Sequence, residues 1–143
     1  MTCCTAGTEQ GTFEEFAGYW QHLIDGCSEP TFFDSLTWQK LWWSEFGANS
    51  ELKLLAVRSD SGDIKMIAPL MIDGSEISFL GSTDLVDYHD FLSTDHSAAG
   101  SLEAVARAVD EMPGVKLINL QSIPGNSATI TKFREFAEKF GWN

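Results

Sequence analysis

Four consecutive residues, Asp87, Tyr88, His89 and Asp90, form the densest group of potentially reactive side chains in this sequence of 143 residues. A carboxylate or an imidazole can take a proton from an attacking amine or hydroxyl group, and a phenol can protonate a leaving thiolate. The four residues are therefore candidates for binding or activating an acceptor substrate. The alternative is that Asp87 and Asp90 accept hydrogen bonds from turn amides while Tyr88 packs with its hydroxyl in water.

The other reactive side chains follow no catalytic or metal-binding pattern. Asp84, Asp87 and Asp90 recur at every third residue, but they lack the glycine and the closing glutamate of a calcium loop. Cys27 and His22 have no further ligands at the spacing of a zinc site. The Gly-x-Ser-x-Gly sequence of a hydrolase nucleophile does not occur. We therefore expect no metal site and no hydrolase.

The charge of the chain limits its partners. Nine Lys and Arg residues against 21 Asp and Glu residues give a net charge of -12, which repels phosphate backbones and anionic lipid headgroups. Neither a secretory leader nor an apolar run long enough to span a bilayer is found. Three cysteines are an odd number without paired spacing, which favours reduced thiols. We expect a cytoplasmic protein with no nucleic-acid or membrane partner.

The apolar pattern predicts the elements that must position these residues. Residues 1–11 are expected to be a flexible leader, and residues 12–143 a single domain. Apolar spacings of three and four predict helices, and shorter apolar runs predict strands. The helices are expected over 12–26, 35–47, 102–112 and 127–141, and the strands over 52–57, 64–68, 76–80, 89–92 and 115–120. The order α-α-β-β-β-β-α-β-α predicts an α/β fold, a mixed sheet with helices on both faces. Because Pro69 cannot donate to a ladder, a bulge or a strand edge is expected there.

The second predicted helix contains a candidate partner surface. Its buried stripe is expected to consist of Trp38, Leu41, Trp42 and Phe46, and Trp43 falls off that stripe. An exposed Trp beside a buried one can mark a binding surface, although a half-buried position at the rim of the same domain is the alternative. In the last helix, Ile130, Phe133, Ala137 and Phe140 are expected to face inward. Phe140 and Trp142, near the end of the chain, are further candidates for the partner surface.

Several short segments, in this order, resemble one acyltransferase family. They are Phe33 to Trp38, Trp42-Trp43 and Phe46-Gly47, then Leu54 to Arg58 with Gly62, Ala68-Pro69-Leu70, Phe79 to Ser82, and Asp87 to Leu92. They resemble the GNAT-like N-terminal half of the acyltransferases grouped with the cellulose-biosynthesis protein CelD, which are related to the FemAB peptidyltransferases.

The resemblance implies a GNAT-like fold and a role in acyl transfer to an amine or hydroxyl acceptor. Proteins of this family are similar to two GNAT folds in tandem, and the acyl-donor chemistry is attributed to the second. The resemblance therefore implies a second GNAT-like domain, in cis or in trans, as partner. It also implies acetyl-CoA or another acyl donor, and a small-molecule or glycan-like acceptor.

The segment expected to bind the donor is poor in the residues that this task requires. A GNAT loop holds pyrophosphate on backbone amides that lead into a helix N-terminus. Residues 93–101 contain one glycine, no Arg or Gln, and Asp95 where phosphate charge would lie. We therefore expect that this chain binds no cofactor and is inactive alone. Two alternatives stay open: a noncatalytic binding module, and a complete small acyltransferase with an unusual donor loop.

Overall fold

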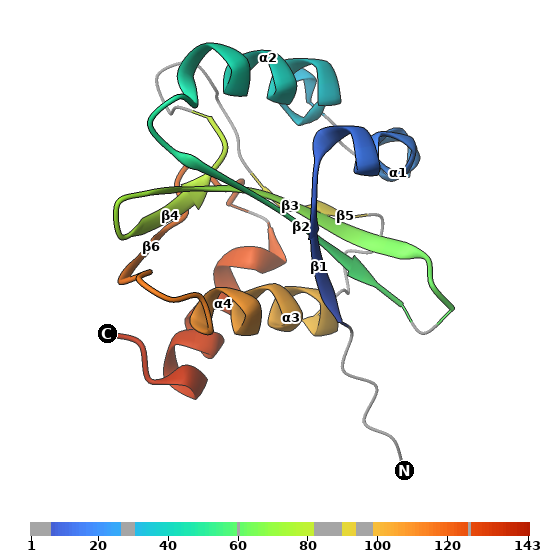
Figure 1. Cartoon of the computed structure of the whole chain (residues 1–143). Helices are drawn as coiled ribbons and strands as arrows, with labels where there is room; N and C mark the ends of the chain where they lie inside the picture. Colours follow the sequence, from blue (N-terminus) through green and yellow to red (C-terminus); the bar gives the residue numbers. More distant parts are fainter. Residues whose placement is uncertain (1–6, 27–30, 60, 82–89, 94–98, 126) are drawn as a thin grey trace.

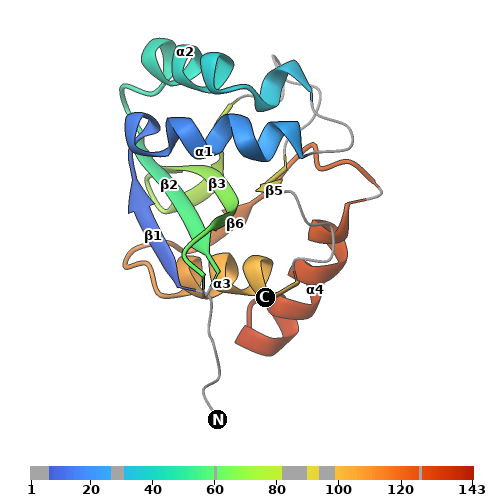
Figure 2. The ribbon, with the colours of Figure 1, turned by 90° about the vertical axis from the view of Figure 1, so that its right-hand side faces the viewer.

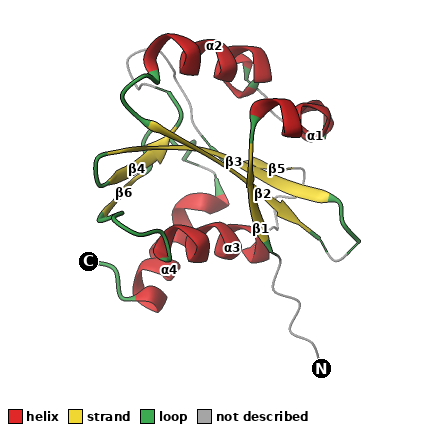
Figure 3. Cartoon of the chain, in the orientation of Figure 1, coloured by secondary structure: helices red, strands yellow, loops and turns green. Residues whose placement is uncertain are grey.

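The computed structural model describes residues 7–26, 31–59, 61–81, 90–93, 99–125 and 127–143. It has an α/β fold, in which a mixed sheet is combined with four α-helices among the described residues (Figures 1 and 3). The elements in chain order are β1 (Thr8–Gly11), α1 (Phe13–Asp25), the 3₁₀ helix η1 (Phe32–Asp34), α2 (Leu36–Phe46), β2 (Glu51–Arg58), β3 (Ile64–Asp73), β4 (Glu76–Phe79), β5 (Leu92–Ser93), α3 (Ala99–Asp110), β6 (Leu117–Asn119) and α4 (Ala128–Phe140).

The sheet has the strand order β1-β2-β3-β4-β6, and β5 pairs with β3 beside β4. The β4–β6 pair is parallel, and the other pairs are antiparallel.

The first strand corrects two predictions. Residues 8–11 belong to the sheet and not to a flexible leader, and the element order begins with a strand and not with a helix. The sequence Thr-Glu-Gln-Gly has no apolar alternation, so periodicity could not reveal it. Backbone pairing with β2 holds it instead, together with an ion pair of 2.8 Å between Arg58 and Glu9.

Helices cover both faces of the sheet, with α1 and α2 on one side and α3 and α4 on the other (Figures 1 and 2). Side chains alternate along each strand, so Leu55 and Val57 face α3 and α4 while Leu54 and Ala56 face α1 and α2. Two apolar clusters result. The buried members of the α3/α4 cluster are Leu55, Val57, Met66, Ala68, Leu70, Ile77, Phe79, Phe91, Leu102, Val105, Ala106, Val109 and Phe136. Those of the α1/α2 cluster are Phe13, Phe16, Trp20, Leu23, Trp42, Leu54, Ala56, Ile64, Ile67, Leu80 and Leu92.

Three of the helices begin at a side-chain cap. The Thr12 hydroxyl accepts a hydrogen bond from the amide of Glu15 at 3.1 Å, and that of Ser35 accepts one from Trp38 at 3.2 Å. Ser127 caps α4, which ends at Gly141 with a φ of 74°. That left-handed conformation favours glycine.

The predicted buried stripes are only partly correct. Leu41 and Phe46 of α2 are 53% and 59% exposed, whereas Gln39 is buried. The reason is that the Gln39 and Trp42 side of α2 faces inward, which turns Leu41 toward solvent. In α4 the buried aromatic residue is Phe136, which the predicted stripe omitted.

A fork in the sheet lies at Pro69. On the side of β3 that faces away from β2, Met66 and Ile67 pair with β5, and the residues from Leu70 onward pair with β4. Pro69 lies between these two pairings. The Pro69 carbonyl accepts a hydrogen bond from the Leu80 amide at 2.9 Å. In an antiparallel ladder the N–H and C=O of one residue point to the same side, so the N–H that proline lacks would also have faced this side.

The chain leaves the sheet directly after this point. Gly81 has a φ of 131°, a backbone conformation that residues with a side chain avoid. The bulge or strand edge predicted at Pro69 is not found, because the residue lies within the central strand β3 and pairs with Leu54 of β2. It lies where the other side of β3 passes from β4 to β5. The irregularity in the ladder between β2 and β3 lies elsewhere, at Val57 and Arg58.

Candidate ligand-binding pocket

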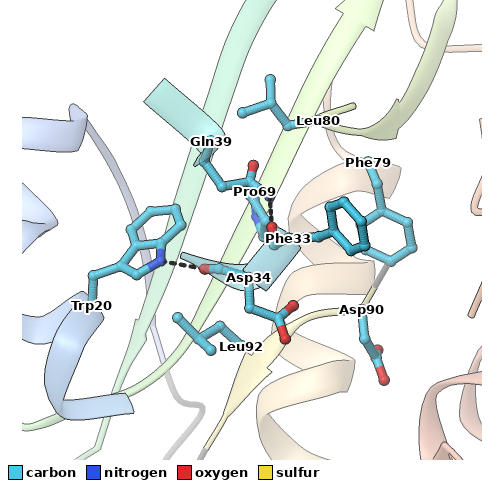
Figure 4. A pocket seen from close by; sticks show the side chains of 9 residues that line it. All are labelled: Trp20, Phe33, Asp34, Gln39, Pro69, Phe79, Leu80, Asp90 and Leu92. Atoms are coloured by element: carbon cyan, nitrogen blue, oxygen red, sulfur yellow. Dashed lines mark hydrogen bonds between the residues drawn. The ribbon is translucent and has the colours of Figure 1, made fainter. Parts of the chain in front are cut away.

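A pocket lies at the fork, between the sheet and the segment formed by η1 and α2 (Figure 4). Its lining consists of Trp20, Phe33, Asp34, Gln39, Pro69, Phe79, Leu80, Asp90 and Leu92. The empty space amounts to ≈ 300 Å³ when the part open to solvent is included, with room for about one water molecule.

Gln39 brings an unsatisfied acceptor to this pocket. The residue is 5% exposed, and its Nε2 donates a hydrogen bond of 2.8 Å to the Phe33 carbonyl (Figure 4). Its Oε1 is buried and has no hydrogen-bond partner within the described part of the chain. A buried acceptor without a partner costs about 1–3 kcal/mol. The amide is thus oriented through its nitrogen by the Phe33 carbonyl, while its oxygen is enclosed without a hydrogen-bond partner.

Asp34 is the second acceptor. Its Oδ2 accepts hydrogen bonds from the Thr31 amide at 2.8 Å and the Thr31 hydroxyl at 3.2 Å. The Trp20 indole holds the same residue from the other side, because its Nε1 donates to the Asp34 carbonyl at 2.8 Å. Burial raises the pKa of the Asp34 carboxyl and the nearby Asp90 carboxylate adds to the effect, whereas the Thr31 hydrogen bonds oppose it. Asp34 is therefore a fixed carboxylate that a positive neighbour would stabilise.

Asp90, one of the four predicted site residues, lines this pocket, but its carboxylate oxygens are largely occupied by hydrogen bonds within the chain. Its carboxylate accepts hydrogen bonds from the hydroxyls of Ser127 at 2.6 Å and Thr129 at 2.7 Å, and from the Phe91 amide at 2.8 Å. It thereby ties the start of β5 to the first turn of α4, where the helix dipole favours a negative charge. For Asp90, these hydrogen bonds favour the structural interpretation over a free catalytic carboxylate. Asp87, Tyr88 and His89 lie outside the described residues.

Gln39 and Asp34 were not predicted as site residues. The sequence signal that could have pointed to Gln39 is its position on α2. Ser35, Gln39 and Trp42 are spaced by four and three residues, so they lie on the same side of the helix. A polar residue on the inward side of a helix needs a hydrogen-bond partner, and this requirement marks it for attention. No such signal exists for Asp34, because its position depends on how η1 folds back over the sheet.

The predicted partner-surface residues are half-buried and pack within the chain. Trp43 packs against the α1/α2 cluster, and Phe140 and Trp142 pack against the α3/α4 cluster with their ring centroids 5.4 Å apart. The Trp142 Nε1 also donates a hydrogen bond of 2.8 Å to the Asp110 carboxylate. For Trp43 this is the half-buried position given as the alternative, whereas the expected exposure of Phe140 and Trp142 is not found. The large apolar side chains that are exposed among the described residues are Tyr19, Phe32, Leu41, Phe46 and Leu117.

Metal ligands and membrane spans can be assessed only within the described ranges. Those ranges contain no group of three or more His, Cys, Asp or Glu side chains arranged to hold a metal ion. None of the helices described there has the length and apolar character needed to cross a membrane.

Comparisons with known proteins gave no relative: no family model matches the chain, and neither a curated protein nor a solved structure matches it significantly.

Proposed function

We propose that this chain is an acyltransferase-family domain, of the GNAT and CelD-like kind, which binds the amine or hydroxyl acceptor of the acyl group. The observation that carries the proposal is that the carboxylates of Asp34 and Asp90 line one pocket at the fork of the sheet (Figure 4). Amine and hydroxyl acceptors are hydrogen-bond donors, and these oxygens accept.

The segments that resemble the family support this proposal by their position. Most of the pocket lining comes from them, namely Phe33, Asp34, Pro69, Phe79, Leu80, Asp90 and Leu92. Segments far apart in the sequence thus converge on one small space. A site for a shared substrate group would account for that convergence.

Asp34 also has a chemical role open to it. A carboxylate near an attacking amine or hydroxyl can accept its proton, and a carboxyl with a raised pKa is a stronger base than an ordinary one. The same residue would then orient the acceptor and receive a proton from it. Asp90 is less suited to that role, since three hydrogen bonds already occupy its oxygens.

The remaining parts of the proposal come from the sequence. The acyl donor, acetyl-CoA or a related compound, would be held by a second GNAT-like domain in cis or in trans. This chain would bind no donor and transfer no acyl group alone, and it would work in the cytoplasm. A noncatalytic binding module is the second candidate. It is favoured by Asp90, because the hydrogen bonds that this carboxylate already accepts within the chain leave it poorly suited to catalysis.

A binding experiment tests the proposal. We would follow the melting temperature with acetyl-CoA, free CoA and a panel of acceptors that includes ethanolamine, glucosamine, glycerol and glucose. A ligand that binds the native state raises the melting temperature in a saturable manner. We expect this for one or more acceptors with the wild-type chain and not with Asp34→Asn.

Two outcomes would contradict the proposal. The first is an absence of any saturable effect from the acceptor panel. The second is saturable binding of acetyl-CoA, which would identify a complete small acyltransferase and overturn the assignment of the donor to a second domain.

A further inference from the structure

We infer that the outer edge of β6 binds the same edge of a second copy of this chain, so that two sheets join across a two-fold axis into one continuous sheet. This inference goes beyond the proposed function and does not depend on it, because β6 lines no part of the pocket.

The first argument is the direction of the backbone groups of β6. This strand lies at one end of the sheet (Figure 1) and pairs with β4 alone in the described part of the chain. The Leu117 amide donates inward, to the Ser75 carbonyl at 3.2 Å. Successive residues of a strand direct their N–H and C=O to opposite sides, so both groups of Ile118 point outward. No described residue forms a hydrogen bond with them there.

This geometry suits an identical edge as the partner. Two Ile118 residues that lie opposite each other in antiparallel strands exchange two N–H···O bonds, because each supplies one donor and one acceptor. A two-fold axis relates such a pair, and two-fold contacts are the commonest way in which identical chains associate.

The second argument is charge. The chain has a net charge of -12, so two copies repel each other. The longest run without Asp or Glu is 112–134, and β6 lies within it. With Ile118 on the axis, the two Lys116 residues would stand four positions apart, about 13 Å, where salt largely screens their repulsion. Glu76 of β4 pairs with Leu117 one strand further in. Pairing through β6 therefore adds little repulsion.

The other end of the sheet gives a contrast. There β1 carries Glu9, which forms an ion pair of 2.8 Å with Arg58, and charges on an edge strand oppose pairing with another chain. In β6 the residues are Leu117, Ile118 and Asn119, which are uncharged, and Leu117 is 53% exposed. Pairing would bring this leucine beside Asn119 of the second copy and cover it.

A dilution series tests the inference. An edge of three residues buries less than the about 1,200–2,000 Å² of a stable interface, so we expect a weak dimer with a Kd of about 0.1–1 mM. Sedimentation equilibrium from about 20 µM to about 2 mM should show the mass rising toward that of a dimer. In ¹H–¹⁵N NMR over the same range, the Ile118 amide signal should shift, and the amide signals of Thr8–Gly11 should not.

Two leucines of equal exposure give matched variants. Leu117 on β6 and Leu41 on α2 are each 53% exposed. Leu117→Glu places two carboxylates close to the axis and should weaken the dimer by about tenfold. Leu41→Glu adds the same charge away from the edge and should leave the Kd unchanged. A circular dichroism melt of each variant confirms that it is folded.

Three outcomes would overturn the inference. The first is a monomer over the whole concentration range. The second is a dimer whose formation leaves the Ile118 amide signal in place, because the contact would then lie elsewhere. The third is equal weakening by both variants, which would reflect the acidity of the chain and not this edge. All three leave the acceptor pocket untouched, since the acceptor panel tests it separately.

Discussion

The two faces of the sheet differ in how completely their side chains are satisfied. On the α3/α4 side, aromatic rings follow one another from Phe79 through Phe91, Phe133 and Phe136 to Phe140, with centroids between 5.1 and 6.2 Å apart. On the other side, the buried polar atoms without a partner in the described chain are Trp38 Nε1, Gln39 Oε1 and Trp42 Nε1, all on α2. One face is thus packed around aromatic rings, and the other contains buried polar atoms whose hydrogen-bonding capacity is not used within the described chain.

The largest expected effect lies on the packed face. Phe136 is 5% exposed and contacts two other aromatic rings, so Phe136→Ala leaves a cavity. We expect the free energy of unfolding, measured by urea denaturation, to fall by about 3–5 kcal/mol. A loss below about 1 kcal/mol would mean that the ring is not part of the core and would remove the contrast between the faces.

A glycine tests the packing on the α1/α2 face. A Cβ atom built on Gly47 would lie 2.3 Å from the Trp43 ring, so Gly47→Ala must displace that ring. Overpacking of this kind costs about 1–3 kcal/mol in the free energy of unfolding. Gly18→Ala is the control, because its Cβ would meet nothing within 4 Å. Inside an exposed helix it should add about 0.5–1 kcal/mol. If both substitutions stabilise the chain, Trp43 does not rest on Gly47.

The pocket should make stability depend on pH through Asp34. Since its pKa is raised above the ordinary value of 3.8, ionisation costs the folded state more than the unfolded state. The wild-type stability should therefore fall as pH rises from 3.8 through the raised pKa, and then stay constant with respect to this group. Asp34→Asn should be the more stable protein at neutral pH, with the difference vanishing below that range. Urea denaturation of both proteins at several pH values measures this. A variant less stable than the wild type at neutral pH would contradict it.

The smallest effect is expected on the outer side of α2. Leu41 is 53% exposed, and alanine is an excellent helix former, so Leu41→Ala should change the free energy of unfolding by less than about 0.5 kcal/mol. The measurement should be repeated at two protein concentrations. A larger, concentration-dependent loss would show that this side chain is covered by a second copy in solution.

The helices and the central strands were predictable because local rules decide them. Ser35 and Ser127 are sequence signals for caps, and Gly141 is one for a helix end. The strand from Thr8 to Gly11 could not be predicted, since its polar residues are held by pairing with a strand more than 40 residues away in the sequence. The prediction that Leu41 lies on the inward side of α2 was wrong for a related reason. Leu41 is apolar, as a core residue should be, but the packing of the whole helix decides which side is buried.

The site was predictable only at Asp90, where a polar cluster stands beside a short strand. Its role as a tie to Ser127 and Thr129 depends on contacts almost 40 residues apart, which no local pattern encodes. Gln39 and Asp34 become visible as a site only when the fork at Pro69 brings η1 and α2 over the open end of the sheet.

The most direct test of the central claim follows the indole protons of the five tryptophans by ¹H–¹⁵N NMR during a titration with ethanolamine, glucosamine, glycerol or glucose. The Trp20 indole donates to the Asp34 carbonyl and lies in the pocket, whereas the Trp142 indole donates to Asp110 on the other side of the sheet. We predict a saturable shift of the Trp20 signal, no shift of the Trp142 signal, and loss of the response in Asp34→Asn. A Trp20 signal that stays in place with every acceptor, or one that moves equally in Asp34→Asn, would contradict the proposal that this pocket binds the acceptor.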